Sequence, residues 1–125
     1  MLKDLAKAVD NESYITATPT EGNPALSDDY VFDKEDEKLV LKDLTMSNFV
    51  GKVKDVGKGA KKRKREGLPQ EYLYVFRYPC ELHRIDAEIS GVVKENVLIY
   101  IKINDRKIPN EIVFIVSFHK NKPVV

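Results

Sequence analysis

The side chains best suited to chemistry lie between residues 51 and 78, where a basic segment leads into a segment rich in aromatic rings. Within residues 51–67, eight bases stand against two acids. The bases are Lys52, Lys54, Lys58, Lys61, Lys62, Arg63, Lys64 and Arg65. Clustered positive charge costs free energy through self-repulsion, and a phosphate backbone relieves that cost. We therefore expect the basic segment to contact an anionic partner, with nucleic acid as the first candidate.

Four rings follow at every second position: Tyr72, Tyr74, Phe76 and Tyr78. In a β-strand this spacing places all four on one face. An exposed ring face would stack bases, as in proteins that bind single strands without sequence preference. A core-facing one would be ordinary strand packing. Because tyrosine hydroxyls are costly to bury without partners, the three tyrosines favour exposure.

Two arginines extend the predicted interface. Arg77 and Arg84 supply guanidinium groups for stacking or for phosphate contacts on a neighbouring surface. They complete the set of predicted nucleic-acid-binding residues.

The charge pattern has other interpretations. The basic segment suits a solvated hairpin tip, and residues 61–65 also match a nuclear localisation pattern. An acidic run at residues 28–38 carries six acids and two lysines. It suits a solvated linker, or an arm that folds over the basic segment and competes there with nucleic acid.

The sequence offers little for catalysis or for metal binding. Cys80 and His83 have C-x-x-H spacing, but the chain has no other cysteine and only one other histidine, whereas structural zinc needs four ligands. Residues three apart on a strand point to opposite faces, so these two do not form a nucleophilic pair. Glycine-rich phosphate loops and paired carboxylates are also missing. We predict no catalytic residue, no metal and no cofactor.

Length and composition indicate a single soluble domain. The chain has 125 residues and a net charge of +1, so its overall charge does not select a partner. One cysteine forms no intrachain disulfide, which favours a reducing compartment. No window approaches the ~20 apolar residues of a membrane span, and the first residues do not resemble a signal peptide. We expect a cytoplasmic protein with no membrane partner.

The apolar pattern predicts a mainly β fold. A short helix is expected at residues 2–9 and strands at 14–18, 39–44, 49–56, 71–78, 81–93, 97–103 and 111–119. Gly51 indicates a bulge, Pro79 a strand end, and residues 94–96 and 104–107 turns. An N-terminal arm (1–38, short helix plus acidic linker) would precede a β domain (39–125). The five to six strands of the β domain favour a small antiparallel barrel of the OB-like type, with a PUA-like or SH3-like barrel or a sandwich as alternatives.

Together these features predict a non-catalytic protein that binds single-stranded DNA or RNA with little sequence preference. Phage, plasmid and other mobile genetic elements use such proteins, and homo-oligomers are left open. The alternative is a protein-interaction or regulatory module. In that case the aromatic strand is core, and the basic loop and the acidic arm contact a protein partner.

Overall fold

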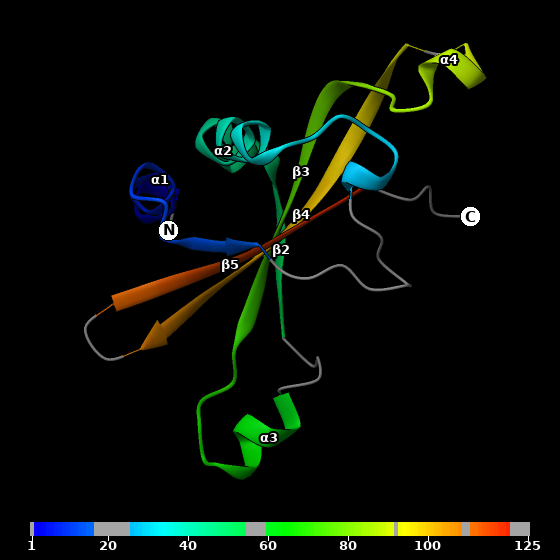
Figure 1. Cartoon of the computed structure of the whole chain (residues 1–125). Coiled ribbons are helices and arrows are strands. Elements are labelled where there is room, and N and C mark those ends of the chain that lie inside the picture. Colours follow the sequence, from blue (N-terminus) through cyan, green and yellow to red (C-terminus); the bar gives the residue numbers. More distant parts are fainter. Residues whose placement is uncertain (1, 17–25, 55–59, 92, 109–110, 121–125) are drawn as a thin grey trace.

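The computed structural model describes residues 2–16, 26–54, 60–91, 93–108 and 111–120. Its centre is a five-stranded sheet in the order β1-β5-β4-β3-β2 (Figure 1). The strands are β1 (Tyr14–Thr16), β2 (Phe49–Lys54), β3 (Tyr72–His83), β4 (Lys94–Ile108) and β5 (Glu111–Lys120). The helices are α1 (Leu2–Asp10), α2 (Lys34–Asp43), α3 (Ala60–Arg65) and α4 (Ala87–Ser90), with 3₁₀ turns η1 (Leu26–Asp28) and η2 (Met46–Asn48).

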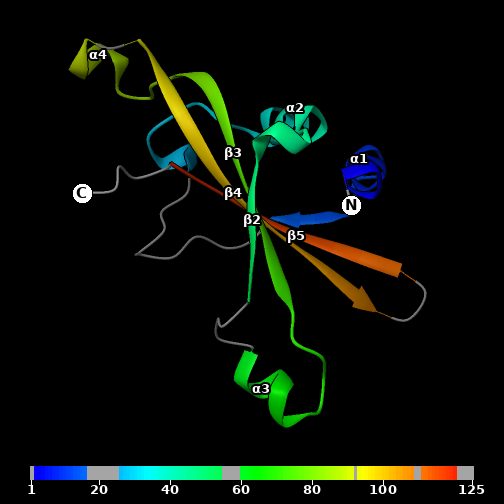
Figure 2. The same cartoon turned by 180° about the vertical axis from the view of Figure 1, so that it is seen from behind.

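The sheet is mixed and open. β1 runs parallel to β5, and the other neighbours are antiparallel. Strong twist makes the strands fan out from a common crossing point in both views (Figure 1, Figure 2). The predictions of a mainly β fold and a short N-terminal helix are confirmed, but the described strands do not close into a barrel.

The two faces of the sheet differ. The first face carries Phe76, Ile101 and Phe118 in one cross-strand row, and α1, α2 and the segment from Leu26 to Phe32 pack against it. The core contains apolar side chains from all these elements: Leu5, Ala8, Val9, Leu26, Tyr30, Val40, Leu41, Leu44, Val97, Ile99, Ile103, Phe114 and Val116. Each large side chain buried in this way contributes roughly 1.5–3 kcal/mol to folding. The opposite side is called the second face below.

α2 replaces a predicted strand. Residues 39–44 were expected to be extended, but Val40, Leu41 and Leu44 face the core from the C-terminal half of a helix and the residue after it. Asp33 caps the start of the helix: its carboxylate accepts a bond from the backbone N–H of Asp36 at 3.0 Å, and the Asp36 carboxylate accepts one from the backbone N–H of Asp33. This capping box, followed by acids in the first turn, is a helix-start signal that outweighs a short apolar run.

Two residues with special backbone properties, Gly51 in β2 and Pro79 in β3, test the predictions made for these strands. The predicted bulge at Gly51 is confirmed by a register shift between Phe49 and Gly51. Pro79 was expected to end its strand, yet β3 continues through it and pairs Pro79 with Leu98. β2 pairs with β3 only as far as Phe76. β3 is therefore an edge strand at Pro79, where a missing N–H donor is tolerated.

The β3–β4 connection also differs from prediction. Residues 81–93 were expected to form one strand or a bent pair, but β3 ends at His83 and α4 follows. Gly91 ends α4 in a left-handed conformation (φ 75°), which glycine adopts without strain. The expected turns at 94–96 and 104–107 both lie inside β4, whose cross-strand pairs run from Lys94 to Ile108.

The N-terminal segments belong to the same core as the sheet. The predicted boundary between residues 38 and 39 falls inside α2, and β1 is itself a strand of the sheet. Tyr30 forms an isolated β-bridge with Arg84, and the Phe32 ring lies 5.3 Å from that of Phe118. The acidic run therefore forms α2 and its approach on the first face, away from the basic hairpin (Figure 1).

Candidate nucleic-acid interface

The predicted basic segment lies at the tip of the β2–β3 hairpin, which extends away from α1 and α2 (Figure 1, Figure 2). Residues 55–59, and with them Lys58, lie outside the described residues. The rest of the run is not a loop as expected, because Ala60–Arg65 forms the short helix α3. Alanine, lysine and arginine are all strong helix formers, so local preference supports this turn of helix.

A glycine cap ends α3. Gly67 has a positive φ of 75°; its N–H bonds to the carbonyl of Lys64 at 3.1 Å, and that of Leu68 bonds to the carbonyl of Arg63 at 3.0 Å. This pair of bonds is a Schellman motif. Gly67 after a run of helix formers is a signal for α3 that the sequence prediction missed.

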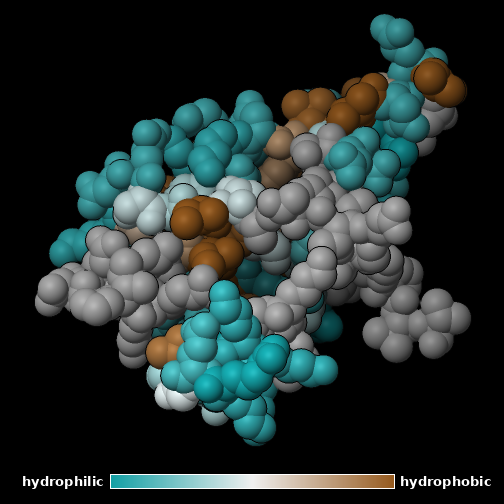
Figure 3. Space-filling model, turned by 60° about the horizontal axis from the view of Figure 1, so that its bottom comes forward, coloured by the Kyte–Doolittle hydropathy of each residue, from teal (hydrophilic) through white to brown (hydrophobic). Residues whose placement is uncertain are grey.

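The five consecutive bases divide into two groups. Arg63 turns back and its Nε lies 2.5 Å from Oε1 of Glu71, with both side chains largely buried. The others, Lys61, Lys62, Lys64 and Arg65, are exposed, and within the described residues they make no ion pair. Hydrophilic side chains accordingly cover this end of the molecule (Figure 3). Arg63 anchors the helix, and the other four present their charge to solvent.

β2 extends the basic surface. Lys52 and Lys54 are exposed on the strand that leads into the hairpin, opposite Tyr74 and Tyr72. The Lys52 Nζ lies 4.5 Å from the ring centroid of Tyr72 and 5.5 Å from that of Tyr74. The structure thus brings Tyr72 and the two lysines together beside α3.

The alternating rings point to the first face. Phe76 is 1% exposed and contacts Phe49 edge-on at 5.4 Å between centroids. Tyr74 and Tyr78 are half-buried against the core, and the Tyr78 hydroxyl donates to Oδ2 of Asp43 at 2.5 Å. That bond and burial raise the pKa of Tyr78 to about 12. Phe76 is therefore a core residue, and of the four rings Tyr72 and Tyr74 lie next to the basic side chains of β2, with Tyr72 nearer to Lys52.

The second face holds a different row. Arg77, Tyr100 and His119 are cross-strand neighbours, and Lys102 follows Tyr100 on the same face of β4. Arg77 is exposed, whereas Tyr100 and Lys102 are partly exposed. The Lys102 Nζ lies 5.6 Å from the Tyr100 ring centroid. Tyr100 is not among the predicted site residues, although its parity, opposite to that of Ile99, Ile101 and Ile103, indicates that it lies on the other face of the strand.

Arg84 is part of a structural cluster rather than of the basic surface. Its guanidinium binds Asp86 through Nε at 2.7 Å and Nη2 at 3.1 Å, and lies 3.4 Å from Glu95. It also lies over the Tyr30 ring at 5.6 Å, and the Tyr30 hydroxyl donates to Glu95. These bonds raise the pKa of Arg84 and lower that of Glu95. The cluster fastens the Tyr30 segment to the ends of β3 and β4.

Cys80 and His83 lie on opposite sides of β3, as their spacing predicts: Cys80 packs against the core and His83 is exposed. Burial raises the pKa of the Cys80 thiol, which disfavours the reactive thiolate. Within the described part of the chain, no three or more His, Cys, Asp or Glu side chains form a group able to hold a metal ion.

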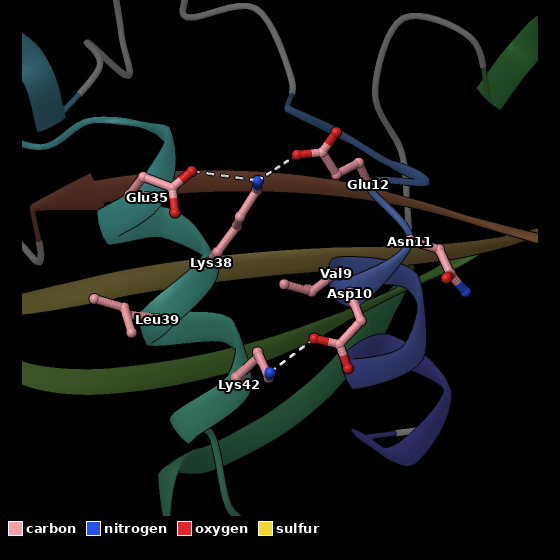
Figure 4. Close-up of a pocket in the computed structure, with 8 residues that line it drawn as sticks. All are labelled: Val9, Asp10, Asn11, Glu12, Glu35, Lys38, Leu39 and Lys42. Carbon is pink, nitrogen blue, oxygen red and sulfur yellow. Dashed lines mark hydrogen bonds and ion pairs between the residues drawn. The ribbon is translucent and has the colours of Figure 1, made fainter.

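A polar hollow of about 470 Å³ lies between α1 and α2 (Figure 4). Lys38 points into it between Glu12 and Glu35, at 2.6 and 3.4 Å, and Lys42 lies 2.7 Å from Asp10. The bond to Glu12 raises the pKa of Lys38 and lowers that of Glu12. Because both lysines are already paired with carboxylates, we interpret the hollow as a helix–helix contact held by ion pairs rather than as a ligand site.

Comparison of the chain with protein-family models, curated proteins and solved structures gives no match. Across the described residues, none of the helices has the length and apolar character needed to cross a bilayer.

Proposed function

We propose that this protein is a non-catalytic nucleic-acid-binding module that holds the phosphates of a single strand at the tip of its β2–β3 hairpin. One observation carries the proposal: Lys61, Lys62, Lys64 and Arg65 project from α3 with no acidic partner among the described residues. Such a cluster repels itself, and a polyanion that displaces condensed counterions relieves the repulsion.

Several bases elsewhere in the molecule are paired with acids. Lys38, Lys42 and Arg84 each lie within 3.4 Å of at least one carboxylate. The fold thus pairs some of its positive charges with nearby carboxylates. In contrast, four bases of the single helix α3 have no acidic partner among the described residues. This contrast favours a partner over a merely solvated tip.

The neighbouring strand supplies a path for the rest of the ligand. Lys52 and Lys54 continue the positive charge along β2, and Tyr72, at the start of β3, offers a partly exposed ring next to them. Phosphate contacts from lysines beside an aromatic ring are the combination used by sequence-tolerant single-strand binders.

The test is a titration of a labelled single-stranded oligonucleotide at several salt concentrations. Each phosphate contact contributes about −0.7 to the slope of log affinity against log salt. Replacing Lys61, Lys62, Lys64 and Arg65 by glutamine removes up to four contacts, so the slope should flatten by up to about 2.8. Glutamine keeps helix preference close to that of lysine, so α3 is preserved.

A matched pair of variants separates a local site from a general charge effect. Lys61→Gln with Lys62→Gln removes two charges from α3, and Lys3→Gln with Lys7→Gln removes two exposed charges from α1. The first pair should weaken binding and the second should leave it unchanged. Equal effects of the two pairs, or no binding at low salt, would contradict the proposal.

A second candidate, the protein-interaction module, has its own supporting observation. The β3–β4 connection carries exposed apolar side chains: Ile85 is 58%, Val93 57% and Ile89 90% exposed. Exposed apolar groups gathered on one projection are typical of protein contacts. A solution mass that rises with concentration and returns to the monomer value in Ile89→Asp, together with no oligonucleotide binding, would favour this candidate.

A further inference from the structure

We propose that the second face of the sheet is a base-stacking platform for single-stranded nucleic acid, in which the Tyr100 ring stacks on a base and Arg77 and Lys102 hold the flanking phosphates. The inference rests on the proposed function, because it assumes that the strand is first held at α3. It adds a site for the bases to a site for the phosphates.

Tyr100 is placed differently from the rings of the first face. Its cross-strand neighbours are Arg77 and His119, whereas those of Phe76 include Ile101 and Phe49. It is partly exposed, and among the described residues its hydroxyl has no hydrogen-bond partner. A ring among polar neighbours gains little from core packing, but it offers a flat apolar surface to a base.

The charge around the ring suits a phosphate backbone. Arg77 is exposed without an ion pair in the described structure, and Lys102 lies 5.6 Å from the ring centroid. Among described side chains, the strands place one carboxylate on the second face: Glu81, nearer the α4 end, 3.5 Å from Lys94. The charges nearest Tyr100 are thus positive, which suits an anionic ligand there, whereas Val75, further along the same face and opposite Lys102, is buried.

The platform is within reach of α3 along one strand. Arg77 follows Leu73, the first residue of β3 on the second face, by four residues, which corresponds to about 14 Å of β-strand. About four stacked nucleotides cover that length at about 3.4 Å each. One short single strand is therefore long enough to contact both the hairpin tip and Tyr100.

The test compares Tyr100→Leu, Tyr100→Phe and the unaltered protein on four probes: oligothymidylate, oligouridylate, a duplex and inorganic polyphosphate. Stacking should make Tyr100→Leu weaker on both single strands by roughly 5- to 150-fold, and Tyr100→Phe should keep its affinity. Duplex and polyphosphate affinities should not change, because their bases are paired or absent. Leu98→Ala, on the same face, is the control, and melting temperatures confirm that each variant is folded.

A fluorescence readout makes the contact direct. The chain has no tryptophan, so Tyr100→Trp introduces a single reporter. Its emission should be quenched by either single strand and unaffected by polyphosphate. Unchanged single-strand affinity in Tyr100→Leu with the salt slope intact would overturn the platform and leave the proposed function standing. Failure of the unaltered protein to bind any nucleic acid would overturn both.

Discussion

The two faces of the sheet use aromatic residues in opposite ways, although both are built from the same strands. On the first face, Phe76 lies in a row with Ile101 and Phe118 and is covered by helices. On the second face, Tyr100 lies between Arg77 and His119, in the row of paired residues next to that of Phe76. The residues opposite a ring, rather than the ring itself, thus accompany the difference between a ring packed in the core and one left partly exposed.

The comparison also corrects a simple expectation about tyrosine. Three tyrosines among four alternating rings favoured an exposed face, because a buried hydroxyl needs a partner. The structure supplies that partner for Tyr78 through Asp43 at the end of α2. A tyrosine on the first face can therefore keep its ring half-buried and its hydroxyl bonded.

The largest expected effect comes from emptying one ring position on each face. Phe76→Ala should lower the free energy of unfolding by about 3–5 kcal/mol, because it leaves a cavity in the core. Tyr100→Ala should cost about 1 kcal/mol, since its site is partly exposed. Urea denaturation of both variants measures the difference, and equal losses would mean that the two faces are not distinct.

Features set by neighbouring residues were predictable from the sequence, whereas features set by packing between distant segments were not. The strand around Ile99–Ile103, the last strand and the Gly51 bulge were predictable because alternation and glycine act locally. The direction of the ring face was not predictable, because it depends on helices that pack from the N-terminal part of the chain.

Two errors had local signals that were given too little weight. Asp33 and Asp36 form a capping box that starts α2, yet the short run Leu39-Val40-Leu41 was interpreted as a strand. Gly67 ends α3 in a Schellman motif, whereas the glycine-punctuated basic run between two strands predicts a loop. In both cases the residues that cap the helix predict the secondary structure better than the composition of the segment does.

The next effect concerns the bond that ties the first face to α2. Tyr78→Phe removes the hydroxyl that donates to Asp43 at 2.5 Å and should cost about 1.5 kcal/mol, as expected for a bond to a charged group near the surface. Tyr100→Phe, its matched control on the second face, should leave stability nearly unchanged. Thermal and urea denaturation at neutral pH check the pair, and equal losses would show that Asp43 does not hold Tyr78.

The same bond predicts a pH dependence. The folded pKa of Tyr78 is about 12, above the ~10 of an unfolded tyrosine, so the folded state keeps its proton longer. This contribution to stability is complete below about pH 10 and is lost as the pH rises through about 12. Denaturation midpoints below pH 10 and at about pH 11 should therefore differ less in Tyr78→Phe than in the unaltered protein. An identical difference in both would contradict the assignment.

A smaller effect of opposite sign is expected at Tyr14, which lies opposite Phe114 in β5. Its hydroxyl is buried without a hydrogen-bond partner among the described residues, and burial raises its pKa to about 12. Tyr14→Phe should increase the free energy of unfolding by about 1 kcal/mol, because it removes an unsatisfied polar group and keeps the ring. A loss of stability would mean that the hydroxyl has a partner.

The smallest effect should come from the ion pairs between the two helices that cover the first face. Lys42 lies 2.7 Å from Asp10, but both side chains are about half exposed, so water and salt screen the pair. A double-mutant cycle with Lys42→Gln and Asp10→Asn should give a coupling of about 0.2–1 kcal/mol that shrinks as salt increases. The buried side chains of Leu5 and Leu41 would then account for most of the stability of this layer. A larger, salt-independent coupling would instead show that the ion pairs between α1 and α2 (Figure 4) help to hold the helices on the first face.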